Sequence, residues 1–206
     1  MIITDRLDPY CYPIDATFDV NKLKESIDIL FARLNISQDI FHDELKIQSA
    51  TTFNLTHLPN LQGNDRWKKH RGSHDAVQKA GVKEEDFSEF LTELDGLYLK
   101  KVIDTVFEMH NSKFKESFQG RCQLIWLRAN HAYRLHRDMH TAHRYHIPVI
   151  TDENCLWVFE NKHRDMTLCH MPADGQAWYL NPKDIKHSVF HMGTQTRMHI
   201  LLTTGS

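Results

Sequence analysis

The second half of the chain consists of short apolar and aromatic runs separated by polar turns, and this pattern constrains the fold most. The runs are "RCQLIWLRA", "YRLHRD", "RYHIPVI", "CLWVFE", "MTLCHM", "QAWYL", "HSVFHM" and "RMHILLTT". The breaks carry turn-forming residues, as in "TDEN", "NKHRD", "PADG", "NPKD" and "MGTQT". Together with "TTFNLTHL" further upstream, about eight or nine short strands at hairpin spacing predict a β-sandwich or a jelly-roll barrel.

The first half has the spacing of amphipathic helices. Apolar residues recur three and four positions apart within residues 19–34 and again within residues 84–110, where Gly96 is expected to break or bend the helix. The loop 62–75 is polar and locally basic, so it is either a solvated surface loop or a mobile lid over a pocket. A length of 206 residues fits one domain. We therefore expect an α+β protein of one domain, residues 1–206, in which a mainly helical part, 1–118, buttresses a β-barrel, 119–206.

Composition narrows the range of partners. The formal net charge is −2, which gives no overall basic field for a nucleic-acid backbone. The chain has neither a signal-peptide pattern nor a spanning apolar run, so the expectation is a cytoplasmic protein with neither a nucleic-acid nor a membrane partner. The four cysteines form no CxxC pair, which argues against a zinc ribbon and a redox dithiol.

Histidine is abundant, with fifteen residues, and two segments share the sequence "HRD". Positions i and i+2 of a strand share a face, so an imidazole and a carboxylate at this spacing can reach one metal ion. A metal site of this kind needs a third ligand, and the candidate is His187. His163 and Asp165 lie in a polar hairpin turn, and they are too close in sequence to His187 for the chain to bring all three into one pocket. His136 and Asp138 end an apolar run, and four predicted strands separate them from His187. We therefore predict that His136, Asp138 and His187 are the metal ligands.

Two histidines and one carboxylate form the facial triad of non-haem Fe(II) oxygenases. The usual co-substrate of such sites is 2-oxoglutarate, whose far carboxylate is suited to a buried, fork-shaped, permanently charged arginine. Arg197 follows His187 across the turn "MGTQT", and its even separation across a hairpin lets both side chains face the barrel interior. Arg197 is therefore the candidate partner for this carboxylate.

With these residues placed, the sequence resembles a known family. From about residue 121 to residue 204, the order of "LHRD", "RYHIPV", "DGQAWYLNPKDIKH" and "HSVFHMGTQTR" is similar to that in the aspartyl/asparaginyl β-hydroxylase-like branch of the Fe(II)- and 2-oxoglutarate-dependent dioxygenases, which includes free-proline hydroxylases. The resemblance implies a double-stranded β-helix with His136, Asp138 and His187 on Fe(II). It implies that Arg197 binds 2-oxoglutarate and that Arg144 and His146 help to bind it.

The resemblance also implies the reaction. O₂ and 2-oxoglutarate would be used to hydroxylate an amino-acid side chain, either in a free amino acid such as proline or in Asp, Asn or Pro within a peptide. The vertebrate peptide-hydroxylating members lack the metal-binding carboxylate, so the presence of Asp138 makes this chain look more like the free-amino-acid or bacterial branch. Some members place a hydroxyl group against the far carboxylate, but "RCQLIWLRAN" contains no Ser, Thr or Tyr, and this contact has no candidate.

Two other functions fit parts of the pattern. A zinc-dependent hydrolase also uses histidines and a carboxylate, but it has no use for Arg197. A non-catalytic cupin-like protein would hold a structural metal or another ligand. Among the remaining candidate residues, His140 and His143 are expected to have no metal role, and Trp126, Trp157 and Trp178 are expected in the core.

Overall fold

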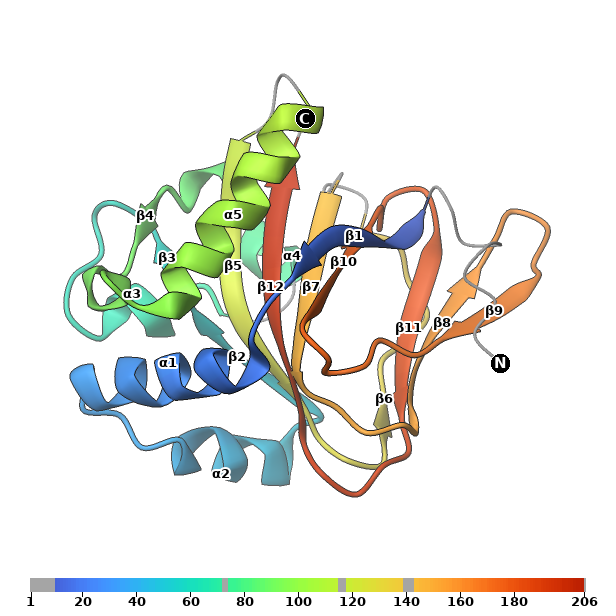
Figure 1. Cartoon of the computed structure of the whole chain (residues 1–206), viewed down its shortest axis with the longest axis horizontal. Coiled ribbons are helices and arrows are strands. Elements are labelled where there is room, and N and C mark those ends of the chain that lie inside the picture. Colours follow the sequence, from blue (N-terminus) through green and yellow to red (C-terminus); the bar gives the residue numbers. More distant parts are fainter. Residues whose placement is uncertain (1–9, 72–73, 115–117, 139–142, 206) are drawn as a thin grey trace.

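Two antiparallel sheets face each other in the computed structural model, which describes residues 10–71, 74–114, 118–138 and 143–205 (Figure 1). The larger sheet has the strand order β1-β10-β7-β12-β5-β2. Its strands are β1 (Cys11–Thr17), β10 (Gln176–Leu180), β7 (His143–Ile150), β12 (Arg197–Gly205), β5 (Phe118–Leu127) and β2 (Ala50–Asn54). This sheet carries most of the core on one face and most of a cavity on the other.

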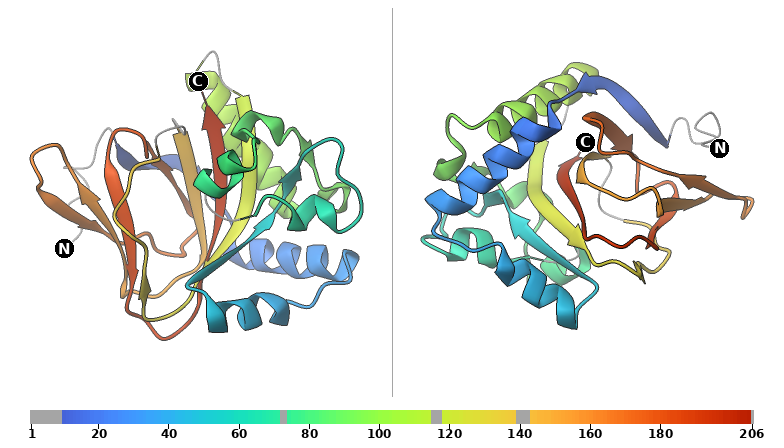
Figure 2. Two further views of the ribbon diagram at one scale, coloured as in Figure 1. Left: turned by 180° about the vertical axis from the view of Figure 1, so that it is seen from behind. Right: turned by 60° about the horizontal axis from the view of Figure 1, so that its bottom comes forward.

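The smaller sheet has four strands in the order β6-β11-β8-β9. They are β6 (His131–Ala132), β11 (Lys186–His191), β8 (Cys155–Glu160) and β9 (Met166–Cys169). From β5 onward the chain passes back and forth between the two sheets, and Figure 2 shows the resulting open-ended barrel. This arrangement is a double-stranded β-helix, which confirms the predicted fold class.

Helices cover the outer face of the larger sheet, as Figure 2 shows from two sides. The longer ones are α1 (Val20–Arg33), α2 (Asp39–Ile47) and α5 (Tyr98–Lys113). The short elements are α3 (Asp65–Lys68), α4 (His74–Lys79), the 3₁₀ turns η2 (Glu84–Asp86) and η3 (Thr92–Leu94), and the paired strands β3 (Thr56–His57) and β4 (Glu89–Phe90). The predicted amphipathic helix at 19–34 is confirmed: Asp19 caps the free amides of its first turn, and its apolar stripe is buried.

The helix expected over residues 84–110 is wrong in its first half. Only α5 is helical, and residues 84–94 form the two 3₁₀ turns and β4. Phe90 pairs with Thr56, and the Leu91 amide donates to the Leu55 carbonyl, so these backbone groups bond to β3 and its neighbour instead of to a helical turn. Gly96 has a φ of +75°, which turns the chain before α5 begins.

Two strands of the larger sheet come from the part of the chain that was predicted to be mainly helical. β2 overlaps the predicted strand "TTFNLTHL", residues 51–58, and lies at the edge beside β5. β1 was not predicted, and it forms the opposite edge, beside β10. Pro13 fits there because an edge strand tolerates a residue that cannot donate a ladder hydrogen bond.

Strand alternation sorts the side chains of the larger sheet. On β5, β7 and β12, every second residue packs against the helices and belongs to the main core, including Leu124, Ile147 and Ile200. The residues between them point into the barrel and are largely polar: Arg121, Gln123, Arg144, His146, Arg197 and His199. Among the described residues, no helix combines the length and the apolar character needed to cross a bilayer.

Candidate active site

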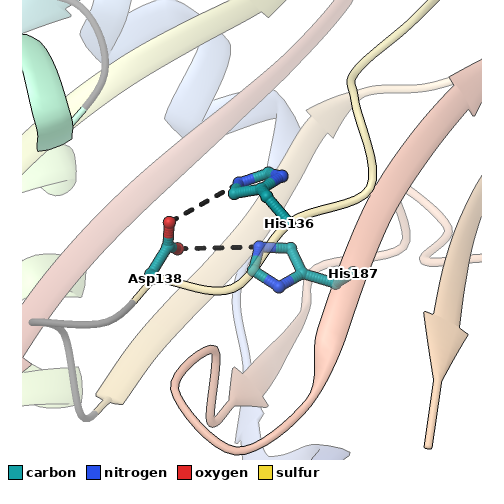
Figure 3. Close-up of side chains that lie close together, drawn as sticks. All are labelled: His136, Asp138 and His187. Carbon is teal, nitrogen blue, oxygen red and sulfur yellow. Dashed lines mark ion pairs between the residues drawn. The ribbon is translucent and has the colours of Figure 1, made fainter.

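His136, Asp138 and His187 lie together at one side of the barrel, with their ligand atoms within 4.8 Å of one another (Figure 3). The Nε2 atom of His136 is 3.5 Å from one Asp138 oxygen, and the Nε2 atom of His187 is 3.6 Å from the other. The backbones of the two histidines exchange both of their hydrogen bonds, at 3.0 and 2.8 Å. This bridge between the segment after β6 and strand β11 brings the two imidazoles side by side.

Backbone carbonyls set the orientation of both imidazoles. Nδ1 of His136 is 2.6 Å from the Arg134 carbonyl, and Nδ1 of His187 is 3.4 Å from the Ile185 carbonyl. A carbonyl only accepts, so each Nδ1 carries the proton and each Nε2 keeps its lone pair. Both lone pairs are therefore on the nitrogen that faces Asp138, which is the arrangement a metal ion requires.

The charge state of the trio also suits a metal. Burial lowers the pKa of His187 to about 4, so the imidazole is neutral and able to ligate at neutral pH. Asp138 is 8% exposed and forms an ion pair with Arg144 from strand β7, which holds the carboxylate in place from the opposite sheet. Two imidazole nitrogens and one carboxylate oxygen with space beside them are a donor set that fits Fe(II).

The trio opens into a cavity of about 650 Å³ between the two sheets. The cavity is lined by Arg144, His146 and Arg197, the three residues that the sequence pointed to for co-substrate binding. This volume is within the range of small-molecule sites, roughly 300–1,000 Å³.

Arg197 is the most unusual group in this cavity. It is 1% exposed, and one guanidinium nitrogen donates to Nδ1 of His199 at 2.8 Å. The guanidinium lies 5.2 Å from the ring centre of Trp157, and its Nε atom is buried without a hydrogen-bond partner. No described carboxylate lies within ion-pair distance of it. A buried cation in this state is suited to an anion, and its planar fork matches the geometry of a carboxylate.

Further polar atoms around Arg197 lack partners among the described residues. Both ring nitrogens of His146, Nε1 of Trp157 and Nε of Arg144 are buried and without hydrogen bonds. Burial, together with the nearby Arg197 and Arg144 cations, holds the pKa of His146 well below its usual range. A dicarboxylate with a keto oxygen offers acceptors for these donors, so the residues present fit 2-oxoglutarate.

One lining residue was missed by the sequence analysis, namely Tyr133. The hydroxyl group was sought within "RCQLIWLRAN", whereas Tyr133 stands just after that segment. Burial raises its pKa to about 12, and the charge of Arg197 acts on it. Tyr133 therefore offers a neutral hydroxyl donor near Arg197. Its signal in the sequence was its position directly before the "RLHRD" segment.

The other "HRD" lies where the sequence placed it. His163 and Asp165 are exposed in the turn between β8 and β9, and Asp165 bonds with Asn161. Of the two remaining histidines of the cluster, His140 is outside the described residues. His143 begins β7 and faces α5, with Nδ1 2.7 Å from the Tyr179 hydroxyl, because it alternates with Arg144.

The N-terminal part completes the cavity wall. Glu44 of α2, Thr52 of β2 and the pair Lys68 and Arg71 all line it. The loop 62–75 was predicted to be either solvated or a lid. In the structure Trp67 is buried, and its ring stacks 5.2 Å from Phe53, which anchors this segment to the core beside the cavity.

No protein-family model matches the chain, and no curated protein matches it in sequence. Solved structures do resemble it. An oxidoreductase of the 2OG-Fe(II) oxygenase family from Burkholderia pseudomallei has a TM-score of 0.56 at 14% identity, over 98% of this chain and 87% of that one. AviO1 from Streptomyces viridochromogenes Tue57 has a TM-score of 0.55 at 12% identity, over 96% and 90%.

A third similar structure is a prolyl hydroxylase from Trichoplax adhaerens in complex with a peptide fragment of the hypoxia inducible factor oxygen degradation domain. It has a TM-score of 0.52 at 10% identity, over 98% of this chain and 87% of that one. At identities this low, the TM-scores show a shared fold alone. The chain therefore has the double-stranded β-helix fold of these structures.

Proposed function

We propose that the protein is an Fe(II)- and 2-oxoglutarate-dependent dioxygenase that hydroxylates an amino-acid side chain. One observation carries the proposal: a cluster of two histidines and an aspartate shares a cavity with a buried arginine that has no described carboxylate partner. The cluster has the donor set for Fe(II), and the arginine requires an anion. A dioxygenase of this class needs both a metal centre and an anion-binding arginine in one cavity.

Each residue has a distinct task in this proposal. His136, Asp138 and His187 hold the iron, which supplies O₂ activation when bound. Arg197 receives the far carboxylate of 2-oxoglutarate, and His199, which accepts from Arg197, fixes the direction of the guanidinium. The two contacts together set the orientation of the co-substrate, which contributes to rate by positioning.

Residues of the two sheets also shield the reaction from water. Trp157 covers the Arg197 guanidinium, and its ring centre is 4.7 Å from that of His146. Arg144 and His146 lie between Arg197 and the metal ligands, where they would donate to the co-substrate near the iron. A closed, dry wall on this side protects a reactive centre from side reactions.

The amino-acid substrate is the finer part of the proposal. It is supported by the resemblance of residues 121–204 to the β-hydroxylase-like branch and by the fold shared with a prolyl hydroxylase. A zinc hydrolase leaves Arg197 without a task, because it needs no buried anion site beside the metal. A cupin-like binding protein would hold an anion at Arg197, but it has no use for a metal centre with open positions.

The experiment is anaerobic loading of the protein with Fe(II) and 2-oxoglutarate, followed by O₂ and measurement of succinate with a panel of amino acids and peptides. Asp138→Ala and His187→Ala are expected to abolish succinate formation. The matched controls are Asp165→Ala and His163→Ala, which alter the other "HRD" at an exposed turn and should leave turnover unchanged. Succinate formation that survives loss of Asp138 and His187 contradicts the proposal.

A further inference from the structure

The cavity is strongly cationic although the chain as a whole carries a formal net charge of −2. Two carboxylates line it, Glu44 and Asp138. The cationic side chains that line it are Lys68, Arg71, Arg121, Arg134, Arg144 and Arg197. Fe(II) and doubly charged 2-oxoglutarate cancel each other, so loading the proposed centre leaves this excess in place.

The excess is divided between the two ends of the cavity. Arg197 lies at the buried end and is assigned to the co-substrate. Lys68 and Arg134 are exposed, so they mark the mouth, and neither has a described carboxylate within ion-pair distance. Substrate must approach through this mouth, because the other end is closed by Trp157 and buried side chains.

Arg71, which forms an ion pair with Glu44, gives the mouth a second cation, held in a fixed position. Its guanidinium donates to Glu44 and to Thr51, both at 2.6 Å, and lies 5.6 Å from the Phe41 ring and 5.9 Å from the Trp67 ring. An arginine held in this way loses little side-chain entropy when it binds an anion.

Arg121 adds a buried cation deeper in the same wall. It is 2% exposed, and its guanidinium forms an ion pair at 3.0 Å with Glu84, which does not line the cavity. The positive charge of Arg121 therefore faces the cavity while its counter-charge lies behind it. An excess of positive charge in a cavity of this kind raises the local concentration of anions.

We propose that the substrate is a small molecule with a net negative charge, whose acidic group, a carboxylate or a phosphate ester, is received at the mouth by Lys68 and Arg71. This inference rests on the proposed function and specifies its substrate class. It favours an acidic amino acid or a comparable small acid over neutral proline and over an uncharged peptide segment.

The first test uses a small-molecule cell extract separated by ion exchange at neutral pH into anionic, neutral and cationic fractions. Each fraction is added to the full chain with Fe(II), 2-oxoglutarate and O₂, and succinate is measured. The anionic fraction is expected to stimulate succinate formation, and phosphatase treatment of that fraction distinguishes a phosphate ester from a carboxylate. Stimulation by the neutral or cationic fraction instead, or none by the anionic fraction, overturns the inference.

The second test uses neighbouring residues as matched pairs. Lys68→Gln is expected to raise the amount of the anionic fraction needed for half-maximal stimulation about fivefold, whereas Lys68→Arg should restore it. Lys69→Gln is the control, because Lys69 is adjacent but does not line the cavity. Arg134→Gln and its control Arg137→Gln form the second pair. Equal effects of Lys68→Gln and Lys69→Gln overturn the inference.

The two proposals fail in different ways. If the protein neither binds 2-oxoglutarate nor forms succinate with any fraction, the proposed function is wrong. If 2-oxoglutarate binds and succinate forms, but neutral compounds stimulate it and the lysine pair does not differ, only the substrate class is wrong.

Discussion

Arg197 is the residue whose chemistry can be tested apart from the metal. Arg197→Lys keeps a positive charge but replaces the planar fork with a point charge, so the two-point contact with a carboxylate is lost. We expect the dissociation constant for 2-oxoglutarate to rise about tenfold or more, while that for Fe(II) changes less than about twofold. Calorimetric titration of each ligand measures both values. Equal losses of the two affinities would show that Arg197 supports the metal site instead.

Arg197 should also lower the free energy of unfolding of the protein when no anion is bound. Its guanidinium is buried with a single described side-chain partner, His199, and Arg197→Met would pack a chain of similar length against Trp157. We expect the free energy of unfolding of the ligand-free protein to rise by about 1–2 kcal/mol. The increase in melting temperature caused by 2-oxoglutarate should disappear. Urea unfolding and thermal shift measure the two effects, with Arg137→Met as the exposed control; a destabilised Arg197→Met protein would refute this account.

At the scale of elements, one ion pair connects the 3₁₀ turn η2 to strand β5. Glu84 and Arg121 are each 2% exposed at the side chain. Glu84→Ala removes the carboxylate but leaves the buried guanidinium, so we expect a loss of about 3 kcal/mol in the free energy of unfolding. The double variant Glu84→Leu with Arg121→Met removes both charges and should recover most of that loss. Denaturant unfolding tests this; a loss below about 1 kcal/mol for Glu84→Ala would mean that water solvates the pair.

Elements whose pattern is set by nearby residues could be predicted from the sequence, whereas those set by distant pairing could not. The strands after residue 121 are each bounded by turn residues, and His187 lies on one of them. His136 and Asp138 follow β6 outside any strand, and a single β-bridge brings His136 beside His187. β1 is a strand because β10 lies beside it, and residues 89–90 leave the helical pattern because they pair with β3. Neither partner is visible in the local sequence.

The residues of the candidate site also fall into those that the local sequence predicts and those that it does not. Arg197, Arg144 and His146 lie on strands that carry their own signal. Glu44, Lys68 and Arg71 reach the cavity only because α2 and the segment around Trp67 dock on the sheet edge, and that docking depends on packing with Phe41 and Phe53. The role of Tyr133 was missed because the hydroxyl group was sought only within residues 121–130, whereas Tyr133 follows β6.

At the scale of the whole molecule, buried histidines tie stability to pH. Burial lowers the pKa of His110 and of His187 to about 4, and it lowers those of His146 and His199 well below the usual value. The unfolded chain takes up these protons below about pH 6.5 and the folded one does not, so stability is complete above that pH and falls as the pH approaches 4.

We therefore expect the urea midpoint of the metal-free protein to fall between about pH 7 and about pH 4.5. His110→Gln does not titrate, and it can still bond to the Tyr145 hydroxyl, which is 2.8 Å from Nδ1 of His110. Its midpoint should fall less steeply over the same range. A midpoint that is constant or rises on acidification would contradict the assignment of neutral buried histidines.

The position of β1 has a consequence for how the protein is made. Cys11, at the start of β1, pairs with Leu180, at the end of β10, so β1 is synthesised long before the strand that it pairs with. High contact order of this kind slows folding. The larger sheet cannot form before β12 is translated, because β12 lies between β7 and β5, and until then β5 and β7 have unpaired edges of the kind that promote aggregation.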